Sequence, residues 1–543
     1  MCAHHRFVFL VDLHLSDQAN TANTHALQWA LEETNQLAPD FLAIGGDITS
    51  YGTAAATTYF LEALAQVQVP FFFTPGNAEL RRPDALPLLH DLLPPQRRWT
   101  VQDDLLVLFP DTATGTLPAA ERTWMQQIVA AQDAVERRIV LTHYPLETLA
   151  QDSSEWLEQW LARHRIELLV AGHQHFQHQR SIGSCLEVVA AALDPHKAFG
   201  DLPGITLFES DTPGQWHHRF IPWSPTIQLL PASRPAAISP VGWSIQGDPV
   251  AAAQETLDFG LSCLEIRPKD LDFSRAELDA MLRQLRHRNH LYLSYHLPSL
   301  KWDPDTNRIS GADTISDHVD CALQAGANSL TVHVPQLPAT AMLNGDAQPS
   351  ALYQEYVDIY ARLFRQPAAA GVRIAIENVH NPLDTPLEAP GFLFATCIEQ
   401  YLGWLETMDQ VMADIPNAPI GALLDVGHAR NNGGELDNLQ PLCEWYARLG
   451  QRILGYHIHQ VDINPDSGRL ANHREITGLF TKRISYAGFL WAWSTHQINR
   501  APLFIEVRDA TGRRNTAVLF KSLFDDAEQF TQATQLPGRQ SLA

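Results

Sequence analysis

Residues 6–14 read RFVFLVDLH, an apolar run that ends in Asp12-Leu13-His14. Alternating β-branched and aromatic residues are typical of a buried strand, and the polar residues come where that strand would end. Similar apolar runs recur through the first 225 residues, separated by amphipathic stretches such as 25–37 and 123–135. This alternation predicts a layered α/β domain. Seven further strands are expected at 40–47, 69–77, 104–111, 137–145, 167–175, 185–193 and 204–210.

Several of these runs end in side chains that bind metals. The ligand-type residues are Asp12, His14, Asp47, Asn77, His143, His173 and His175. Because the same ends of adjacent strands lie together, we expect these side chains to converge. Their oxygen and nitrogen donors suit Mn²⁺, Fe²⁺ or Zn²⁺, and the set suffices for two metals with open positions for water. With Asp47 as the bridging carboxylate, the pattern predicts two-metal hydrolysis of a phosphoester.

The order D-x-H, G-D, G-N, H, G-H-x-H resembles the calcineurin-like metallophosphoesterase family over about residues 5–225. The resemblance implies a four-layer α/β sandwich with Asp47, Asn77 and His143 as catalytic residues. It assigns one metal to Asp12, His14, Asp47 and His175, and the other to Asp47, Asn77, His143 and His173.

The chain departs from this family at Ala78, where the family usually has a histidine that stabilises the transition state or protonates the leaving group. A general acid is typically worth about 10²–10⁴ in rate. Either the substrate has a good leaving group or supplies its own proton, or the domain binds phosphorylated ligands and turns them over poorly. We favour the working enzyme because all seven ligands are retained.

A proline-rich stretch, residues 226–240, predicts a linker between this domain (1–225) and a second domain (241–543). In the second domain, strand-like runs alternate regularly with helix-like stretches. Eight such runs predict a (β/α)₈ TIM barrel, whose active site lies at the carboxyl ends of its strands. The runs are 237–245, 263–268, 290–298, 329–335, 372–380, 421–429, 453–462 and 502–509.

Carboxylates and imidazoles also gather at the ends of the barrel runs, and a cation is the simplest reason for such groups to converge. They are His296, His333, Glu377, Asp425, His428, His457, His459, His473 and Glu506. We expect one to three Mn²⁺ or Zn²⁺ ions there. Three basic residues, Arg267, Lys301 and Arg508, are candidates to hold a substrate phosphate or carboxylate.

Residues 238–530 resemble the xylose-isomerase-like TIM-barrel superfamily, which includes sugar isomerases and epimerases as well as the endonuclease IV nucleases. In the isomerase branch the resemblance implies one metal on Glu377, Asp425, His457 and Glu506, with the two glutamates moving protons beside a carbonyl. In the nuclease branch it implies three zinc ions, with His296, His333, His428 and His473 as further ligands. The nuclease has an aspartate where this chain has Ala471, and His459 is the candidate to compensate.

The net charge of −23 and the lack of a Lys/Arg-rich run argue against a nucleic-acid or anionic-membrane partner. The six cysteines form no C-x-x-C pair, which favours a reducing cytoplasm. No apolar run approaches the roughly 20 residues that a membrane helix needs. The oligomeric state is left open.

Together the two halves predict a bifunctional metalloenzyme. The first domain would hydrolyse a phosphoester of a small sugar- or polyol-like metabolite, and the barrel would isomerise, epimerise or otherwise process it. Two alternatives are nucleic-acid repair by a multinuclear, nuclease-like barrel, and a ligand-sensing protein with retired active sites.

Overall fold

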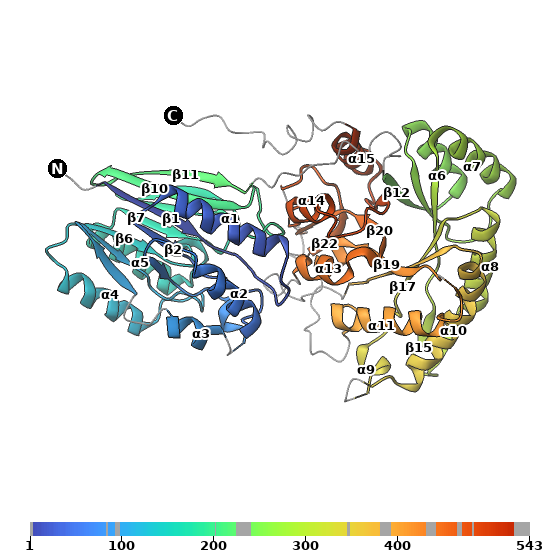
Figure 1. Cartoon of the computed structure of the whole chain (residues 1–543), viewed down its shortest axis with the longest axis horizontal. Helices are drawn as coiled ribbons and strands as arrows, with labels where there is room; N and C mark the ends of the chain where they lie inside the picture. Colours follow the sequence, from blue (N-terminus) through green and yellow to red (C-terminus); the bar gives the residue numbers. More distant parts are fainter. Residues whose placement is uncertain are drawn as a thin grey trace. The chain divides into compact units, whose positions relative to one another are not determined.

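The computed structural model describes residues 4–82, 85–92, 98–200, 202–223, 240–344, 348–380, 392–416, 418–430, 441–463, 470–480 and 483–525. The chain forms two compact units (Figure 1), which are Met1–Ile227 with Arg483–Ala492, and Gln228–Lys482 with Trp493–Ala543. The predicted linker lies outside the described residues up to position 239.

The first unit contains two sheets. The five-stranded sheet has the order β11-β10-β1-β2-β3, and the six-stranded sheet has the order β4-β5-β6-β7-β9-β8. The five strands are β1 (His5–Leu10), β2 (Phe41–Ile44), β3 (Phe71–Phe73), β10 (Gly204–Thr212) and β11 (Gln215–Pro222). The six strands are β4 (Trp99–Gln102), β5 (Leu105–Leu108), β6 (Arg137–Leu141), β7 (Leu168–Ala171), β8 (His178–Ile182) and β9 (Cys185–Val189).

The core of this unit lies between the two sheets, because side chains alternate between the faces of each strand. Phe7 and Phe9 of β1 pack against Val107 and Ile139 of the other sheet. Residues of the opposite parity, such as Leu106, pack outward with the helices. The helices are α1 (Ala22–Leu37), α2 (Ala54–Leu64), α3 (Ala85–Leu92), α4 (Ala119–Ala131) and α5 (Gln151–Arg163). The predicted four-layer α/β sandwich is confirmed.

The second unit is a closed barrel in which every strand is parallel to its neighbours. Its strands are β12 (Val241–Gln246), β13 (Cys263–Arg267), β14 (Tyr292–His296), β17 (Ser329–His333), β18 (Arg373–Glu377), β19 (Ile420–Asp425), β20 (Ile453–Ile458) and β23 (Leu503–Ile505). Each of the eight overlaps a predicted run, with β12 and β19 extending one residue beyond theirs, so the (β/α)₈ barrel is confirmed.

Helices and two hairpins connect the barrel strands. The helices are α6 (Pro249–Phe259), α7 (Arg275–Asn289), α8 (Ala312–Gln324), α9 (Ala339–Met342), α10 (Ala351–Ala369), α11 (Ile398–Val411), α12 (Val426–Arg430), α13 (Leu442–Leu449), α14 (Ala487–Ser494) and α15 (Ala510–Asp525). The hairpins are β15 (Lys301–Asp303) with β16 (Arg308–Ser310), and β21 (Gln460–Ile463) with β22 (Leu470–Arg474). Within the described ranges, no helix is both long enough and apolar enough to cross a bilayer.

Two layers fill the barrel interior. The lower, apolar layer contains Cys263, Ala375, Leu423 and Phe504. Two residues further along the same strands stand Glu265, Glu377, Asp425 and Glu506. Residues i and i+2 of a strand point to the same side, so this acidic layer lies directly above the apolar one, toward the carboxyl ends of the strands. The strand period therefore places the carboxylates at the mouth of the barrel.

Candidate metal centres

The first ligand group follows the ends of β1, β2 and β7. One ligand atom from each of Asp12, His14, Asp47 and His175 lies within 4.8 Å of the others. The Nε2 atoms of His14 and His175 are 3.0 Å apart, and His14 Nε2 lies 3.7 Å from Asp47 Oδ2. Two ring nitrogens and two carboxylates thus face one small volume, as ligands of one cation would.

The second ligand group shares Asp47 with the first. Asn77 Oδ1 lies 3.1 Å from both His143 Nε2 and His173 Nδ1. His143 Nε2 lies 3.5 Å from Asp47 Oδ1, the carboxylate oxygen that does not face His14. Asp47 therefore presents one oxygen to each ligand group, which is the arrangement expected of a bridging carboxylate.

The backbone at these strand ends is unusual. Asp12, His14, Asp47, His173 and His175 all have φ between 47° and 70°, the left-handed region that residues other than glycine rarely adopt. Such conformations persist only where the surrounding structure enforces them, and they cluster at functional sites.

One support for this backbone is Glu79, which we did not predict as a site residue. Its carboxylate accepts hydrogen bonds from the backbone N–H groups of Asp47, Thr49 and Gly76, at 2.9, 3.1 and 2.9 Å. Burial raises the pKa of Glu79 to about 8. Gly76 is required because a Cβ atom there would lie 2.3 Å from Asp47 Oδ1.

The electrostatics of the first site fit divalent cations. Burial and the charge of Asp47 raise the pKa of Asp12, and Asp12 Oδ1 has no hydrogen-bond partner among the described residues. Burial lowers the pKa of His14, and it lowers the pKa of His173 to about 3, so both imidazoles are neutral. Neutral imidazoles beside crowded carboxylates are ligands ready for Mn²⁺, Fe²⁺ or Zn²⁺.

The barrel mouth brings its nine predicted ligands into three groups. Glu377 belongs to two of them, and Asp425 contacts histidines of the third. The groups are His296, His333 and Glu377; Glu377, Asp425, His457 and Glu506; and His428, His459 and His473, each with ligand atoms within 4.8 Å of one another.

Glu377 connects the first two groups. Its Oε2 lies 2.9 Å from His296 Nε2 and 3.2 Å from His333 Nε2, whereas its Oε1 lies 3.1 Å from His457 Nδ1. Glu506 Oε2 lies 2.9 Å from the same His457 nitrogen. The two oxygens of Glu377 thus face different groups, so one carboxylate can serve two cations.

Asp425 connects the second group to the third. Its Oδ2 lies 3.7 Å from His457 Nδ1 and 3.3 Å from His428 Nδ1, and its Oδ1 lies 3.0 Å from His459 Nε2. The ring centroids of His459 and His473 are 4.5 Å apart. The nine ligands therefore form one continuous cluster.

The place of His459 depends on Gly427. A Cβ atom at Gly427 would lie 1.9 Å from Cε1 of the His459 ring, so the ring occupies the space of a missing side chain. Ala471 lies two residues before His473 on β22, and the register of the β21–β22 hairpin shifts over this stretch. His459, between β20 and β21, is the donor that we propose takes the place of a carboxylate at position 471.

Glu265 is a buried acid of the barrel that we did not predict as a ligand or catalytic residue. Its carboxylate accepts hydrogen bonds from Ser244, Ser294 and Thr331, and it lies 2.7 Å from His457 Nε2. The period-two repeat through Cys263 and Glu265 is the signal that could have revealed it. A carboxylate on the far ring nitrogen fixes the tautomer and orientation of a metal-binding histidine.

The charge on His457 indicates that the carboxylates around it suit a bound cation. Burial opposes the charged ring, but the carboxylates of Glu377 and Glu265 outweigh it and raise the pKa of His457. In the metal-free protein a proton on His457 therefore balances the carboxylates that surround it. A divalent ion would take over that role with His457 neutral.

The three predicted phosphate-binding residues have different surroundings. Arg267 donates a hydrogen bond from Nη1 to Glu506, so it lies beside the ligand cluster. Lys301 is exposed on the β15–β16 hairpin, and Arg508 is exposed after β23. Of these three basic residues, Arg267 is the one whose side chain contacts a predicted ligand among the described residues.

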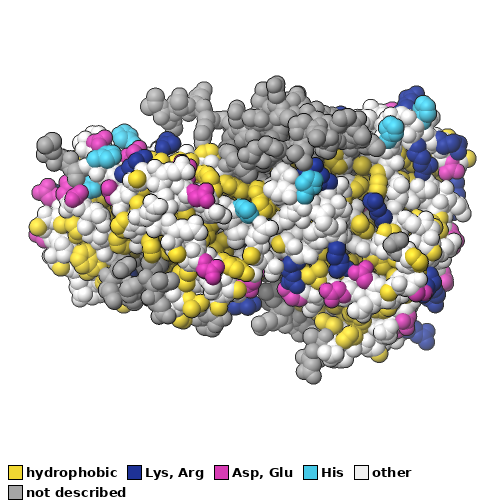
Figure 2. Space-filling model, viewed as in Figure 1, with side chains coloured by type: hydrophobic (Ala, Val, Ile, Leu, Met, Phe, Trp, Pro, Cys, Tyr) yellow, Lys and Arg dark blue, Asp and Glu magenta, His cyan; other side chains and the backbone are white. Residues whose placement is uncertain are grey.

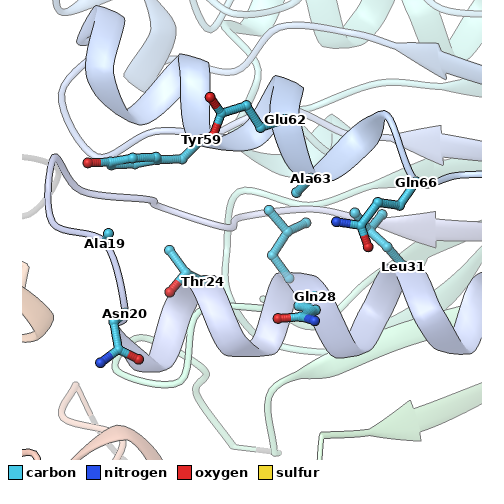
Figure 3. A pocket seen from close by; sticks show the side chains of 10 residues that line it. Ala19, Asn20, Thr24, Gln28, Leu31, Tyr59, Glu62, Ala63 and Gln66 are labelled. Atoms are coloured by element: carbon cyan, nitrogen blue, oxygen red, sulfur yellow. The ribbon is translucent and has the colours of Figure 1, made fainter.

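A pocket of about 280 Å³ lies between α1 and α2 in the first unit (Figure 3). Its lining includes Leu27, Gln28, Tyr59 and Gln66, and none of the predicted metal ligands. Its side chains carry no donor set of the kind found at either metal centre, so we do not assign the pocket to the chemistry.

Comparisons with known proteins match the two units to two families. The family model "Calcineurin-like phosphoesterase" matches residues 5–177, and the model "Xylose isomerase-like TIM barrel" matches residues 253–516. A comparison with curated proteins found no match.

Solved structures are similar to parts of this chain at low sequence identity. A dimetal phosphatase from Danio rerio is 11% identical, covers 40% of this chain and 99% of its own, and has a TM-score of 0.32. A xylose isomerase domain protein from Planctomyces limnophilus is 14% identical, covers 55% and 99%, and has a TM-score of 0.38. A 3-keto-D-glucoside 4-epimerase from E. coli is 13% identical, covers 52% and 98%, and has a TM-score of 0.34.

Proposed function

We propose that this chain, a calcineurin-like metallophosphoesterase domain followed by a xylose isomerase-like TIM barrel, is a metal-dependent enzyme with two active sites. Phosphoester hydrolysis by the first site is supported mainly by one observation. Asp47 presents one carboxylate oxygen to His14 and the other to His143, so two ligand groups share it.

In the first site, bound divalent metals would supply a hydroxide nucleophile at neutral pH and would neutralise the phosphate charge. The protein residues hold the ligands in place. Glu79 fixes the turn that carries Asp47, and the His143 Nδ1 contacts the Gly45 carbonyl at 2.8 Å, which turns Nε2 toward the site. The proposed substrate is a small phosphorylated metabolite with a sugar- or polyol-like part.

For the barrel, the continuous cluster favours a multinuclear hydrolytic site over a mononuclear one. Isomerisation needs one metal group, which leaves the five further histidines unexplained. Their burial among carboxylates is costly without cations. We therefore propose that the barrel binds up to three Mn²⁺ or Zn²⁺ ions and cleaves a phosphoester of a small molecule.

Isomerisation or epimerisation is the second candidate for the barrel. Glu377 and Glu506 both approach His457 Nδ1, at 3.1 and 2.9 Å, and so face each other across one metal position. Two opposed glutamates are suited to moving a proton away from and back to a carbon beside a carbonyl.

Metal content and product analysis separate these candidates. Metal-loaded protein is analysed for metal per chain, and purified protein is then incubated with sugar phosphates. About five metals per chain, with phosphate or alcohol release that Glu377→Gln abolishes, would support the multinuclear hydrolase. About three metals and interconversion of isomers without phosphate release would support the isomerase. The variant Asp47→Asn should abolish only the reaction of the first site.

A small substrate rather than a nucleic acid is proposed for both sites. On the face drawn in Figure 2, Lys and Arg side chains lie scattered among acidic ones and form no continuous basic band. The net charge of −23 also opposes polyanion binding. Tight binding of an abasic DNA duplex at low salt would overturn this part of the proposal. A cytoplasmic location is proposed because no disulfide joins any of the five described cysteines.

A further inference from the structure

A cation stands close to the position where the first site lacks an imidazole. The 3₁₀ turn η1 (Ala78–Leu80) begins after Asn77 and ends at Arg81, whose N–H donates to the Ala78 carbonyl at 3.2 Å. Side chains three residues apart eclipse each other on such a turn. The Arg81 side chain therefore leaves the turn on the same side as the Ala78 methyl group.

Arg81 is held beside the first ligand group. Its Nη1 donates to the Ser50 carbonyl at 2.5 Å, and the Ser50 hydroxyl donates to the His14 carbonyl at 2.7 Å. Burial lowers the pKa of His14 and of His173, and the charge of Arg81 lowers both further. The guanidinium thus lies within electrostatic reach of a ligand from each of the two groups.

A second cation, Lys197, is linked to the metal ligand Asp12 through Asp194. Lys197 is 6% exposed, and its backbone N–H donates to the Asp194 carbonyl at 3.2 Å. Asp194 in turn donates its N–H to the Asp12 carbonyl at 3.0 Å. Burial and Asp47 raise the pKa of Asp12, and the charge of Lys197 opposes them. The backbone of Lys197 is therefore two hydrogen bonds from that of Asp12, and a buried lysine here is suited to an anionic substrate group.

These cations differ chemically from the imidazole that Ala78 replaces. A methyl group donates no proton, and a guanidinium keeps its protons at any pH a protein survives. A leaving group that is stable as an anion, and so needs no proton from any of these groups, is therefore favoured. An alkoxide departs poorly in that form, whereas a phosphate, whose second pKa is about 6, departs readily. A leaving phosphate also carries charge that a second cation can neutralise, and arginine binds phosphate oxygens in pairs.

We propose that the first site cleaves phosphoanhydrides, with Arg81 and Lys197 binding the two phosphates that flank the bond that breaks. The proposal rests on the hydrolytic function proposed above. The oxygen of a water molecule forms the new bond to phosphorus, and the bridging P–O bond breaks. The bridging oxygen keeps the electron pair and leaves with its phosphate, and the proton of the water passes to solvent.

The test compares three substrates with full-length, metal-loaded protein that carries Glu377→Gln, so that the barrel reaction proposed above does not contribute. They are ADP as the anhydride, p-nitrophenyl phosphate as an aryl ester and glycerol phosphate as an alkyl ester. We expect the alkyl ester to be cleaved at least about 10²-fold more slowly than ADP, which is the value of a missing general acid. Ala78→His should raise the alkyl-ester rate without raising that for ADP.

Substitutions of Arg81 and Lys197 test whether these side chains bind the phosphates of the substrate. Arg81→Gln and Lys197→Met should each lower kcat/KM for ADP by about 10²-fold, as for loss of a charge-stabilising group. The kcat/KM for the aryl ester, whose leaving group is not a phosphate, should fall clearly less. Arg81→Lys should retain part of the ADP activity. Metal content equal to that of the Glu377→Gln parent shows that each variant is folded at the site.

Two results would overturn the proposal. One is equal loss of ADP and aryl-ester activity in the cation variants, which would indicate a general effect on the site. The other is cleavage of the alkyl ester as fast as ADP. Failure of the underlying hydrolytic function would look different, because the metal-loaded Glu377→Gln parent would then cleave none of the three substrates.

Discussion

The third ligand group of the barrel allows a test by loss and rescue of a metal. His459 reaches this group through the space left at Gly427, where a Cβ atom would lie 1.9 Å from the ring. Ordinary contact needs about 3.4–4 Å, so Gly427→Ala must displace the ring by roughly 1.5–2 Å. Metal–ligand distances tolerate only about ±0.2 Å. The substitution should therefore remove His459 from the ligand set.

We expect Gly427→Ala and His459→Ala each to lose about one metal per chain, measured by elemental analysis after dialysis at limiting metal. The double variant His459→Ala with Ala471→Asp should regain it, because the new carboxylate would stand two residues before the ligand His473. Gly403→Ala is the matched control, since a Cβ atom there meets no heavy atom within 4 Å.

The reasoning would be refuted if His459→Ala kept the wild-type metal content. It would also be refuted if the aspartate at position 471 restored none of the lost metal while the double variant remained folded. Overpacking at Gly427 costs about 1–3 kcal/mol of stability, so circular dichroism must show a native fold at the assay temperature.

Three further outcomes follow from other contacts. Glu265→Gln should weaken metal binding at the barrel by about 10–100-fold in a competition titration with a chelator, because it removes the charge behind His457. Asn378→Ala should lower the free energy of unfolding by about 2–5 kcal/mol in urea melts, since the Asn378 side chain pairs with both the N–H and the carbonyl of Asp425. Chelated protein should lose thermal stability as the pH rises from about 7.5 to 8.5, where the buried histidines of lowered pKa carry almost no proton in either the folded or the unfolded state. Burial raises the pKa of Glu79 to about 8, and carboxylates raise the pKa of His457, so both groups bind more protons folded than unfolded in that window. Metal-loaded protein should show no such loss, because metal binding strengthens as ligands lose protons.

Sequence patterns predicted the central strands of both units better than the strands at the edges of the sheets. The barrel strands are bounded apolar runs, which period-two and composition arguments identify directly. We did not predict the edge strand β8, whose residues are half-buried or exposed and whose sequence HQRSI has no apolar face. The β21–β22 hairpin, which carries His473, was also missed, because the predicted run 453–462 joined most of β21 to β20 as one strand.

The candidate site was predictable where ligands follow strand ends and less so where one residue makes room for another. Glu265 was accessible in principle, because it repeats the two-residue step from the apolar to the acidic layer. Gly427 was not, because its role is defined by the His459 ring from a different strand. The contact between Arg267 and Glu506 likewise joins residues from β13 and the end of β23, which no local pattern connects.

The two metal centres are built in different ways, and this bears on how each would respond to losing its metals. In the barrel, Glu377 and Asp425 are the last residues of regular strands, so sheet hydrogen bonds hold their backbone without help from a cation. In the first unit, Asp12 and Asp47 sit in left-handed turns whose strain must be offset by other contacts. Glu79 provides some of these contacts, and bound metals would provide the rest. The strand-based centre is therefore preorganised by its fold, whereas the turn-based centre depends on its ligands as well.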